Sequence, residues 1–305
     1  MSLMNVVQSK IVCFQNKGTD GTVYMKMIKT VQEMQTLATH LRTDGRKIGL
    51  VPTMGYLHEG HLSLIRIARR KADVVVISVF VNPTQFGPDE DFAKYPRDIE
   101  RDKRLAIQEG VDIFFYPSDE EMYSKRHLTF VTVDDITGVL CGASRPLHFK
   151  GVTTVCTKLF HVVKPHFAVF GQKDYQQSVV IKRMVKDLNF DMEIVIAPII
   201  READGLAMSS RNAYLSAEER KDALSLQTAL KMAESRIKQG ETKTATLIRE
   251  MKDYISSKIY TKIDYIKIVH PDTLHDLDVI EDRAVAALAV FVGKTRLIDN
   301  VILQV

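Results

Sequence analysis

Short runs of continuous apolar residues alternate with amphipathic segments over the first two thirds of the chain. In the amphipathic segments apolar residues recur at helical spacing, which predicts helices at residues 31–42, 62–71 and 98–109. The continuous runs predict strands at residues 47–51, 74–81, 113–116, 167–170 and 194–200. Continuously apolar strands separated by helices are typical of a parallel sheet that is buried on both faces. The pattern therefore predicts a doubly wound α/β domain.

The pattern changes after about residue 200. A polar loop is followed by a helix with Leu226, Leu230, Ala233 and Ile237 on one face and by a second helical stretch near residues 247–259. Three strands follow, at residues 263–269, 284–291 and 296–304. This order predicts a smaller C-terminal α+β domain that caps the first. The expected division is a loose N-terminal extension at residues 1–23, to which no function is assigned, a first domain at residues 24–199 and a second at residues 200–305.

Polar clusters follow three of the predicted strands. His58 and His61 come after the strand at residues 47–51, residues 82–87 follow the next strand, and residues 171–177 follow the strand at residues 167–170. In doubly wound sheets, ligands bind beyond the carboxyl ends of the strands. The three clusters are therefore expected to meet at one rim of the sheet.

The segment at residues 51–65 places two histidines where a strand turns into a helix. Residues three apart share a helix face, so His58 and His61 can reach one anion that is also attracted by free backbone N–H groups and the helix dipole. The preceding Thr-Met-Gly permits close approach of the backbone to a nucleotide. Surface histidines or half a metal site would have the same spacing. Zinc has little support, because the cysteines lack C-x-x-C spacing.

Other polar side chains can bind oxygen atoms or phosphates. Asn82 and Gln85 offer neutral donors and acceptors, although an ordinary Asn-Pro turn also explains them. Lys173 and Asp174 combine a phosphate-directed ammonium with a ribose- or metal-directed carboxylate, or form a commonplace exposed ion pair. Residues 208–212, Met-Ser-Ser-Arg-Asn, supply two hydroxyls and a guanidinium for phosphates, or a helix cap.

Composition narrows the class of protein. The 305-residue chain has 42 basic and 38 acidic side chains, a net charge of +4 and no tryptophan. The basic clusters are short and form no continuous stripe, so nucleic acid is not an expected partner. Three scattered cysteines indicate a reducing compartment, and no apolar run approaches the ~20 residues that span a bilayer. A cytoplasmic protein without a membrane partner is therefore expected.

Several motifs together resemble one family. The chain carries, in this order, P-T-M-G-x-L-H-E-G-H, F-V-N-P-T-Q-F-G, D-F-A-K-Y-P-R-D, F-G-Q-K-D-Y-Q-Q and M-S-S-R-N. From about residue 24 onward it resembles the pantoate–β-alanine ligases, or pantothenate synthetases. The resemblance implies a Rossmann-like sheet of the HxGH nucleotidylyl-transferase type. It also implies a reaction in which pantoate and ATP give pantoyl adenylate and pyrophosphate, after which β-alanine displaces AMP to form pantothenate.

The resemblance further implies roles for single residues. His61 occupies the position of the catalytic proton donor, and His58 would stabilise the transferring phosphate, with Lys173 and Arg211 as further catalytic groups. The positions that match ATP-binding residues are Met54, Gly55, Tyr56, Leu57, His58, Glu59, Gly60, His61, Gly171, Gln172, Lys173, Asp174, Ile200, Met208, Ser209, Ser210 and Arg211.

The remaining implications concern the other substrates and partners. Gln85 and Gln177 fall on pantoate-binding positions, with Gln85 also close to β-alanine and Asn82 beside them. Mg²⁺ would accompany ATP as a cofactor. Its ligands are not identified: Asp89, Asp91 and Asp98 are available, but carboxylates near a loop are more often solvated than coordinated. The family commonly forms homodimers through the first domain, so a homodimer is expected.

Two departures from the family concern loops. Gln172 stands where the family often has glutamate. Leu147 stands where it often has glycine, within the basic segment at residues 144–151, which is expected to be a lid or a connection. Two other functions compete with the ligase: nucleotidylyl transfer to a different acceptor, and a catalytically silent nucleotide- or RNA-binding protein. The intact histidine pair weighs against silence, and Asn82, Gln85 and Gln177 favour pantoate as the acceptor.

Overall fold

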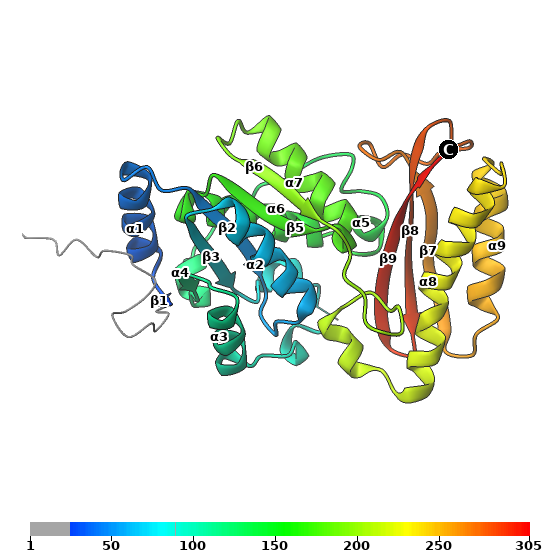
Figure 1. Cartoon of the computed structure of the whole chain (residues 1–305), viewed down its shortest axis with the longest axis horizontal. Coiled ribbons are helices and arrows are strands. Elements are labelled where there is room, and N and C mark those ends of the chain that lie inside the picture. Colours follow the sequence, from blue (N-terminus) through cyan, green and yellow to red (C-terminus); the bar gives the residue numbers. More distant parts are fainter. Residues whose placement is uncertain (1–24, 89) are drawn as a thin grey trace, which may run out of the picture.

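The structure, a computed structural model, describes residues 25–88 and 90–305. Over these residues it contains a six-stranded parallel sheet, with strand order β1-β4-β3-β2-β5-β6, and a three-stranded antiparallel sheet (Figure 1). The expected fold class, a doubly wound Rossmann-like domain with a smaller C-terminal α+β domain, is confirmed. The parallel strands are β1 (Lys26–Ile28), β2 (Ile48–Thr53), β3 (Val74–Val79), β4 (Ile113–Phe115), β5 (Phe167–Gly171) and β6 (Glu193–Ala197).

Helices cover both faces of the parallel sheet. One face carries α1 (Val31–Thr43), α6 (His148–Val163) and α7 (Tyr175–Asp187), and the other carries α2 (Glu59–Lys71) and α3 (Ile99–Gln108). This arrangement leaves the edge of the sheet at the carboxyl ends of its strands as the place where connecting loops gather.

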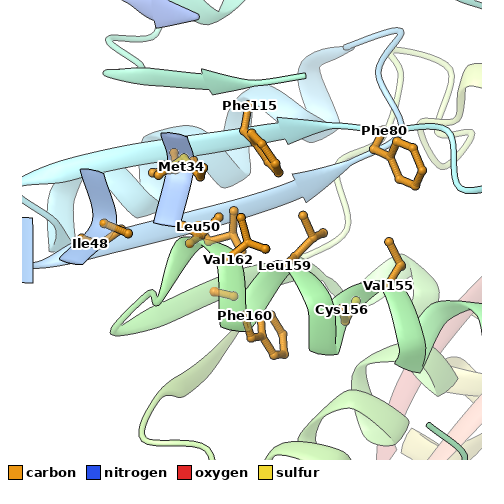
Figure 2. Packing of buried hydrophobic residues seen from close by; sticks show 14 of the residues in the cluster. Met34, Ile48, Leu50, Phe80, Phe115, Val155, Cys156, Leu159, Phe160 and Val162 are labelled. Carbon is orange, nitrogen blue, oxygen red and sulfur yellow. The ribbon is translucent and has the colours of Figure 1, made fainter. Parts of the chain in front are cut away.

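The strands are apolar throughout because successive side chains enter different cores. In β3, Val74 and Val76 pack in the core beneath α1 and α6, whereas Val75 and Ile77 pack in the core beneath α2. Figure 2 shows the first of these cores, in which Leu50 of β2 faces the apolar side of α6. A strand with only one buried face would instead show alternating polar residues.

The direction of the chain through the sheet reverses between β2 and β5. From β2 the chain proceeds outward through β3 to β4, and it then returns to add β5 and β6 on the other side of β2. Ligands of doubly wound sheets bind at such a switch point, where loops from neighbouring strands diverge. The loop after β2 leads to His58 and His61, and the loop after β5 leads to Lys173.

The C-terminal unit has its helices on one face of its sheet. Alternate residues of its central strand, such as Leu288 and Val290, pack beneath the helices, while Val285 and Ala287 pack against Phe149 of the first unit. The elements of this unit are α8 (Ala217–Lys238), α9 (Thr244–Ser256), β7 (Thr261–Val269), β8 (Arg283–Val292) and β9 (Thr295–Gln304).

Two features bear on the expected division of the chain. The boundary predicted between residues 199 and 200 falls in the connection from β6 to α8, and it stays a prediction. The extension predicted at residues 1–23 lies outside the described residues.

None of the helices in the described part of the chain is long and apolar enough to cross a membrane.

The segment at residues 144–151 is only partly the loop that was predicted. The structure has α5 (Cys141–Ser144), a short connection, and then the first turn of α6 from His148. The sequence pattern was not read as a helix at α6: eleven of its 16 residues are buried, and the remaining ones, such as Lys150 and His161, form only a narrow polar stripe. The 13-residue helix α7 also escaped prediction. So did the short elements β1, α4 (Asp119–Met122), η1 (Pro83–Gln85), η2 (Phe92–Lys94), η3 (Gln172–Asp174) and η4 (Ser210–Tyr214).

Gly151 is the point at which α6 touches η1. A β-carbon there would lie 2.4 Å from the Thr84 carbonyl oxygen and 2.5 Å from the backbone of Gln85. Helix propensity alone would make alanine more favourable than glycine by about 1 kcal/mol. The contact reverses that sign, because overpacking against backbone costs about 1–3 kcal/mol.

We therefore expect Gly151→Ala to lower the free energy of unfolding, measured by urea titration. Gly87→Ala is the matched control, since the nearest atom to its β-carbon would be 3.6 Å away. A Gly151→Ala protein as stable as the unsubstituted chain would contradict the close approach of α6 to η1.

Candidate active site

A cavity of about 280 Å³ lies between the two units, where the carboxyl ends of the parallel strands meet the antiparallel sheet. The first unit contributes the loops after β2, β3 and β5, and the second contributes residues of β7, β8 and β9. The sequence-predicted residues in its wall are Met54, His58, Gly60, His61, Asn82, Gln85, Gly171, Lys173, Asp174, Gln177, Ile200, Met208, Ser209, Ser210 and Arg211. The structure thus brings the three polar clusters into one cavity.

His58 and His61 lie at the entrance of α2. His58 is the residue before the first turn, and the two ring centroids are 4.0 Å apart at an interplanar angle of 32°. The His58 backbone N–H donates to Nδ1 of His61 at 3.3 Å. In a neutral ring this leaves the proton of His61 on Nε2, so His61 offers an Nε2–H donor.

Both imidazoles are held in the neutral form. Burial, followed by the Lys173 ammonium, lowers the pKa of His58 from 6.5 to about 4. Burial, the His58 ring and Lys173, in that order, lower the pKa of His61 well below its usual value. Among the described residues Nδ1 of His58 is buried without a hydrogen-bond partner. The pair can therefore meet an anion only as neutral hydrogen-bonding groups, and the positive charge beside it belongs to Lys173.

The glycines of this segment serve the protein's own packing. Gly55 has φ +83°, and a β-carbon there would lie 2.9 Å from Val79 Cγ1 and 3.0 Å from an Asp102 carboxylate oxygen. A β-carbon on Gly60 would lie 2.9 Å from the His58 ring. Glycine is needed at these positions for a left-handed turn and for the seat of an imidazole, which differs from the expected reason of close approach to a nucleotide.

Asn82 uses its side chain within the protein. Its Nδ2 donates to Oε1 of Gln85 at 3.2 Å and to the Gly151 carbonyl at 3.1 Å, and its Oδ1 accepts from the Tyr123 hydroxyl at 2.8 Å. Asn82 is fully buried, and it caps η1, as the alternative reading of an Asn-Pro turn expected. Its amide orients that of Gln85, whose Nε2 lies 2.9 Å from the Met54 sulfur in the cavity wall.

Side chains that can donate hydrogen bonds to a phosphate come from two further segments. After β5, the Lys173 ammonium lies 4.0 Å from the Asp174 carboxylate, and Gln177 follows on the first turn of α7. At the start of η4, Ser209 accepts the Arg211 backbone N–H at 3.3 Å. These groups line the same cavity as the histidine pair, which makes the cavity wall suitable for a polyanion.

Two carboxylates at the cavity wall each form an ion pair with a guanidinium group. Asp91 accepts two hydrogen bonds from Arg211, at 2.9 and 2.8 Å, and Glu90 accepts two from Arg145, at 2.8 and 2.5 Å. Burial opposes ionisation of Asp91, but pairing with Arg211 is stronger and lowers its pKa. A phosphate group has the same bidentate complementarity to arginine as these carboxylates.

Some predicted ATP residues do not line the cavity. Leu57 is fully buried in the core beneath α2, Glu59 pairs with Arg66 on the outer side of that helix, and the Tyr56 ring lies 5.2 Å from the Arg101 guanidinium. Gly55 and Gln172 also lie behind the wall, in the turns that carry its lining residues. For these positions the structure supports a backbone role in shaping the loops.

Several lining residues were not predicted as site residues. Arg145 and His148 belong to the R-P-x-H-F element, which could have signalled them, whereas Tyr265, Arg296 and Asn300 of the second unit carry no local signal. Asp102, behind the wall, accepts the N–H groups of Tyr56 and Leu57 at 2.7 Å each. In the sequence it appears only as an aspartate within a predicted amphipathic helix, which does not by itself mark it as part of a site.

Possible metal ligands are limited. Within residues 25–88 and 90–305, no group of three or more His, Cys, Asp or Glu side chains is arranged to hold a metal ion. Asp91 is engaged by Arg211, and Asp98 accepts the Arg101 N–H as the cap of α3. Asp89 lies outside the described residues. Asp174 is the half-exposed carboxylate in the wall, and one carboxylate suits Mg²⁺ that is bound mainly through substrate phosphates.

The lowered pKa of His58 predicts acid sensitivity of the fold. Between pH 6.5 and about pH 4, His58 binds a proton in the unfolded chain but not in the folded chain. The free energy of unfolding therefore decreases as the pH falls through this range, whereas above pH 6.5 His58 is neutral in both states and causes no loss. At pH 5 the loss would be at most about 2 kcal/mol.

We expect His58→Gln to lose less stability than the unsubstituted chain between pH 7 and pH 5, measured by urea unfolding at both values. The histidines away from this pair keep their surroundings in both proteins, so their contributions cancel. Removal of the His58 ring also relaxes the lowering of the His61 pKa, which changes the pH dependence in the same direction. Parallel losses in the two proteins would show that His58 is not kept neutral by folding.

Comparison with known proteins places this chain in a family. The model of the pantoate-beta-alanine ligase family matches residues 26–302. The pantothenate synthetase of Moorella thermoacetica is 57% identical over 281 residues, which are 92% of this chain and 99% of that protein. That of Caldicellulosiruptor bescii is 55% identical over 280 residues, or 92% and 99% of the two chains.

Solved structures agree with the sequence comparison. A pantothenate synthetase from Thermus thermophilus superposes with a TM-score of 0.86 at 45% identity, covering 91% of this chain and 99% of that one. A pantoate-beta-alanine ligase from Francisella tularensis, complexed with beta-gamma ATP and beta-alanine, has a TM-score of 0.77 at 34% identity and covers 91% and 97%. The expected resemblance is confirmed, and the chain belongs to the pantoate–β-alanine ligase family.

Proposed function

We propose that this ligase joins pantoate to β-alanine in the cavity between its units, with ATP as the energy source and pantoyl adenylate as the intermediate. The observation that carries the proposal is the neutral pair His58 and His61 at the entrance of α2, facing Lys173 at the switch point of the sheet. ATP and β-alanine are bound by the Francisella relative, which supports the same substrates here.

In the first step, a pantoate carboxylate oxygen attacks the α-phosphorus of ATP, and the bond to the pyrophosphate oxygen breaks. Charge develops on the phosphoryl oxygens and on the leaving group, so donors held ready for them lower the barrier. His61 donates from Nε2 to the transferring phosphate, and His58 supports it. Lys173, the two serine hydroxyls of residues 209–210 and Arg211 accompany the leaving pyrophosphate.

Arg211 changes partner when ATP binds. Its guanidinium is paired with Asp91, and a phosphate offers the same two-pronged acceptor with greater charge. We infer that the nucleotide displaces Asp91, which then becomes free to move away from the anion. Asp174 is the carboxylate that would hold Mg²⁺ together with the substrate phosphates, and the ion would then supply additional neutralisation of phosphate charge.

Pantoate occupies the part of the cavity beside α6. Gln85, oriented by Asn82, and Gln177 donate to its hydroxyl and carboxylate oxygens. The same wall contains apolar side chains, including Phe149 and Val152, which suit the dimethyl-substituted carbon of pantoate. A glutamine pair without nearby apolar surface would select less well among hydroxy acids.

In the second step, the neutral amine of β-alanine attacks the acyl carbon of the adenylate, and AMP leaves with the bonding electron pair. The mixed anhydride is prone to hydrolysis, so enclosure between two units protects it from water. The two competing functions lose their support, because the relatives are named as synthetases of this one product. A homodimer and a cytoplasmic location are further proposals, supported by the family resemblance and by the scattered cysteines.

The adenylate proposal predicts exchange of labelled pyrophosphate into ATP. We expect exchange when pantoate and Mg²⁺ are present and β-alanine is absent, because the first step is then reversible and the second cannot proceed. Adding β-alanine should yield pantothenate and AMP in equal amounts. Pantothenate formation without any pantoate-dependent exchange or burst of pyrophosphate would argue for a concerted reaction.

For His61→Ala we expect a loss of about 100-fold or more in the exchange rate, with the fold retained, because the variant removes a donor to the transferring phosphate. Arg66→Ala, on the outer face of the same helix, is the matched control and should exchange normally. Near-normal exchange by a folded His61→Ala protein would exclude the assigned role.

A further inference from the structure

Asn300 joins the C-terminal unit to the backbone on both sides of Lys173. It lies on β9 and is fully buried, and its Nδ2 donates to the Gln172 carbonyl at 3.0 Å and to the Lys173 carbonyl at 2.9 Å. Its Oδ1 accepts from the Gln172 side-chain amide at 3.4 Å. Both donors of the Asn300 amide are therefore used on one short segment of the other unit.

These two carbonyls belong to the peptide groups that flank the α-carbon of Lys173. The orientation of two successive peptide planes defines φ and ψ of the residue between them. Those angles in turn set the direction of its Cα–Cβ bond. By holding both planes, Asn300 determines where the Lys173 side chain starts, although it does not touch that side chain.

The direction matters because, within the described residues, no ion pair closer than 4.0 Å orients the ammonium of the partly buried Lys173 side chain. Its ammonium is 4.0 Å from Asp174, a separation that gives a weak ion pair. It nonetheless lies close enough to both histidines to lower the pKa of each. A shift of the backbone beneath Lys173 would therefore move the ammonium relative to both histidines.

The neighbouring residue of β9 holds the other phosphate-side segment. Asp299 is buried and accepts two hydrogen bonds from Arg201, at 2.6 and 3.1 Å, while Arg201 pairs with Ala207 in an antiparallel bridge just before Met208. Asp299 also accepts the backbone N–H of Asn300 at 2.8 Å. Two adjacent residues of the second unit thus brace both segments that carry the proposed pyrophosphate contacts.

We propose that Asn300 is a positioning residue for the adenylation step, acting through Lys173. The inference rests on the proposed function, since it requires Lys173 to contact the phosphates of ATP. The second step takes place after pyrophosphate has left, so it does not need Lys173 in that place. Loss of Asn300 should therefore slow the first step and spare the second.

The test measures both steps in a set of folded variants. We expect Asn300→Ala to lower pantoate-dependent ATP–pyrophosphate exchange by at least about 10-fold, because a displacement of about 1 Å is sufficient for such losses. Aminolysis of supplied pantoyl adenylate by β-alanine should stay within about 2-fold of the unsubstituted rate. Equal losses in both steps, or unchanged exchange, would overturn the proposal.

A double-mutant cycle with Lys173 separates positioning from general support of the fold. If Asn300 acts through Lys173, Asn300→Ala adds little to the loss already caused by Lys173→Ala; independent effects would multiply and would refute the proposal. Lys173→Ala also tests the underlying function by itself. If Lys173→Ala exchanges normally, the phosphate role of Lys173 is wrong. If Lys173→Ala is impaired but Asn300→Ala is normal, only the positioning role of Asn300 is wrong.

The control is Thr244→Ala in the same unit. Thr244 is buried on α9, and its hydroxyl hydrogen-bonds the carbonyls of Leu277 and Asp278, so the variant also removes a donor to backbone, away from the cavity. It should lose stability but keep normal exchange. If Asn300→Ala is insoluble, Asn300→Ser retains one donor and should show a smaller loss in the same step. Loss of exchange in the Thr244→Ala protein would show that instability alone explains the effect.

Discussion

The buried carboxylate of Asp102 holds the turn between β2 and α2, and the rest of the site depends on that turn. Its two oxygens accept the N–H groups of Tyr56 and Leu57, in a loop where Gly55 and Tyr56 both have positive φ. A strained turn persists only when its surroundings determine it, and here a charged acceptor replaces the water that the two amides would otherwise bind. Because the turn is held, α2 starts with His58 and His61 directed into the cavity.

The electrostatics of the cavity follow from burial at this place. An isolated pair of surface histidines would titrate near neutral pH, but desolvation keeps these two uncharged, and Lys173 strengthens the effect. The cavity therefore separates two tasks: neutral imidazoles donate hydrogen bonds, and ammonium and guanidinium groups carry the charge. This separation suits a reaction in which the transferring and leaving phosphates are different groups.

The two units make different contributions to the same cavity. The parallel sheet provides the histidine pair, Gln85 and Lys173 after its strand ends, and the connection that leads to α8 adds Arg211 at η4. The antiparallel sheet provides a buried face that packs on Phe149 and Val180, together with buried polar residues such as Asn300 that bind the loops of its neighbour. Asn82 has the same indirect function within the first unit, since its amide is used up in orienting Gln85 and contacting Gly151.

The sequence by itself determined most of the fold and most of the candidate residues. Strands buried on both faces and helices with one apolar side leave a local record in the chain, and the rule that ligands bind at strand ends then brought His58, Gln85 and Lys173 together. The resemblance to the ligases added roles to those positions. What the pattern did not reveal was α6, which has only a narrow polar stripe, the helix α7, and β1, which is only three residues long.

Only the tertiary structure decided how these residues are held. Gly151 must be glycine because the backbone of η1 lies against it, and Asn82 turned out to support Gln85. Asn300 binds the Lys173 carbonyl from 127 positions away in the chain. Contacts of this kind join residues that are distant in sequence, and a single buried hydrogen bond or close approach produces no periodic pattern. Their partners become identifiable only when the chain is folded.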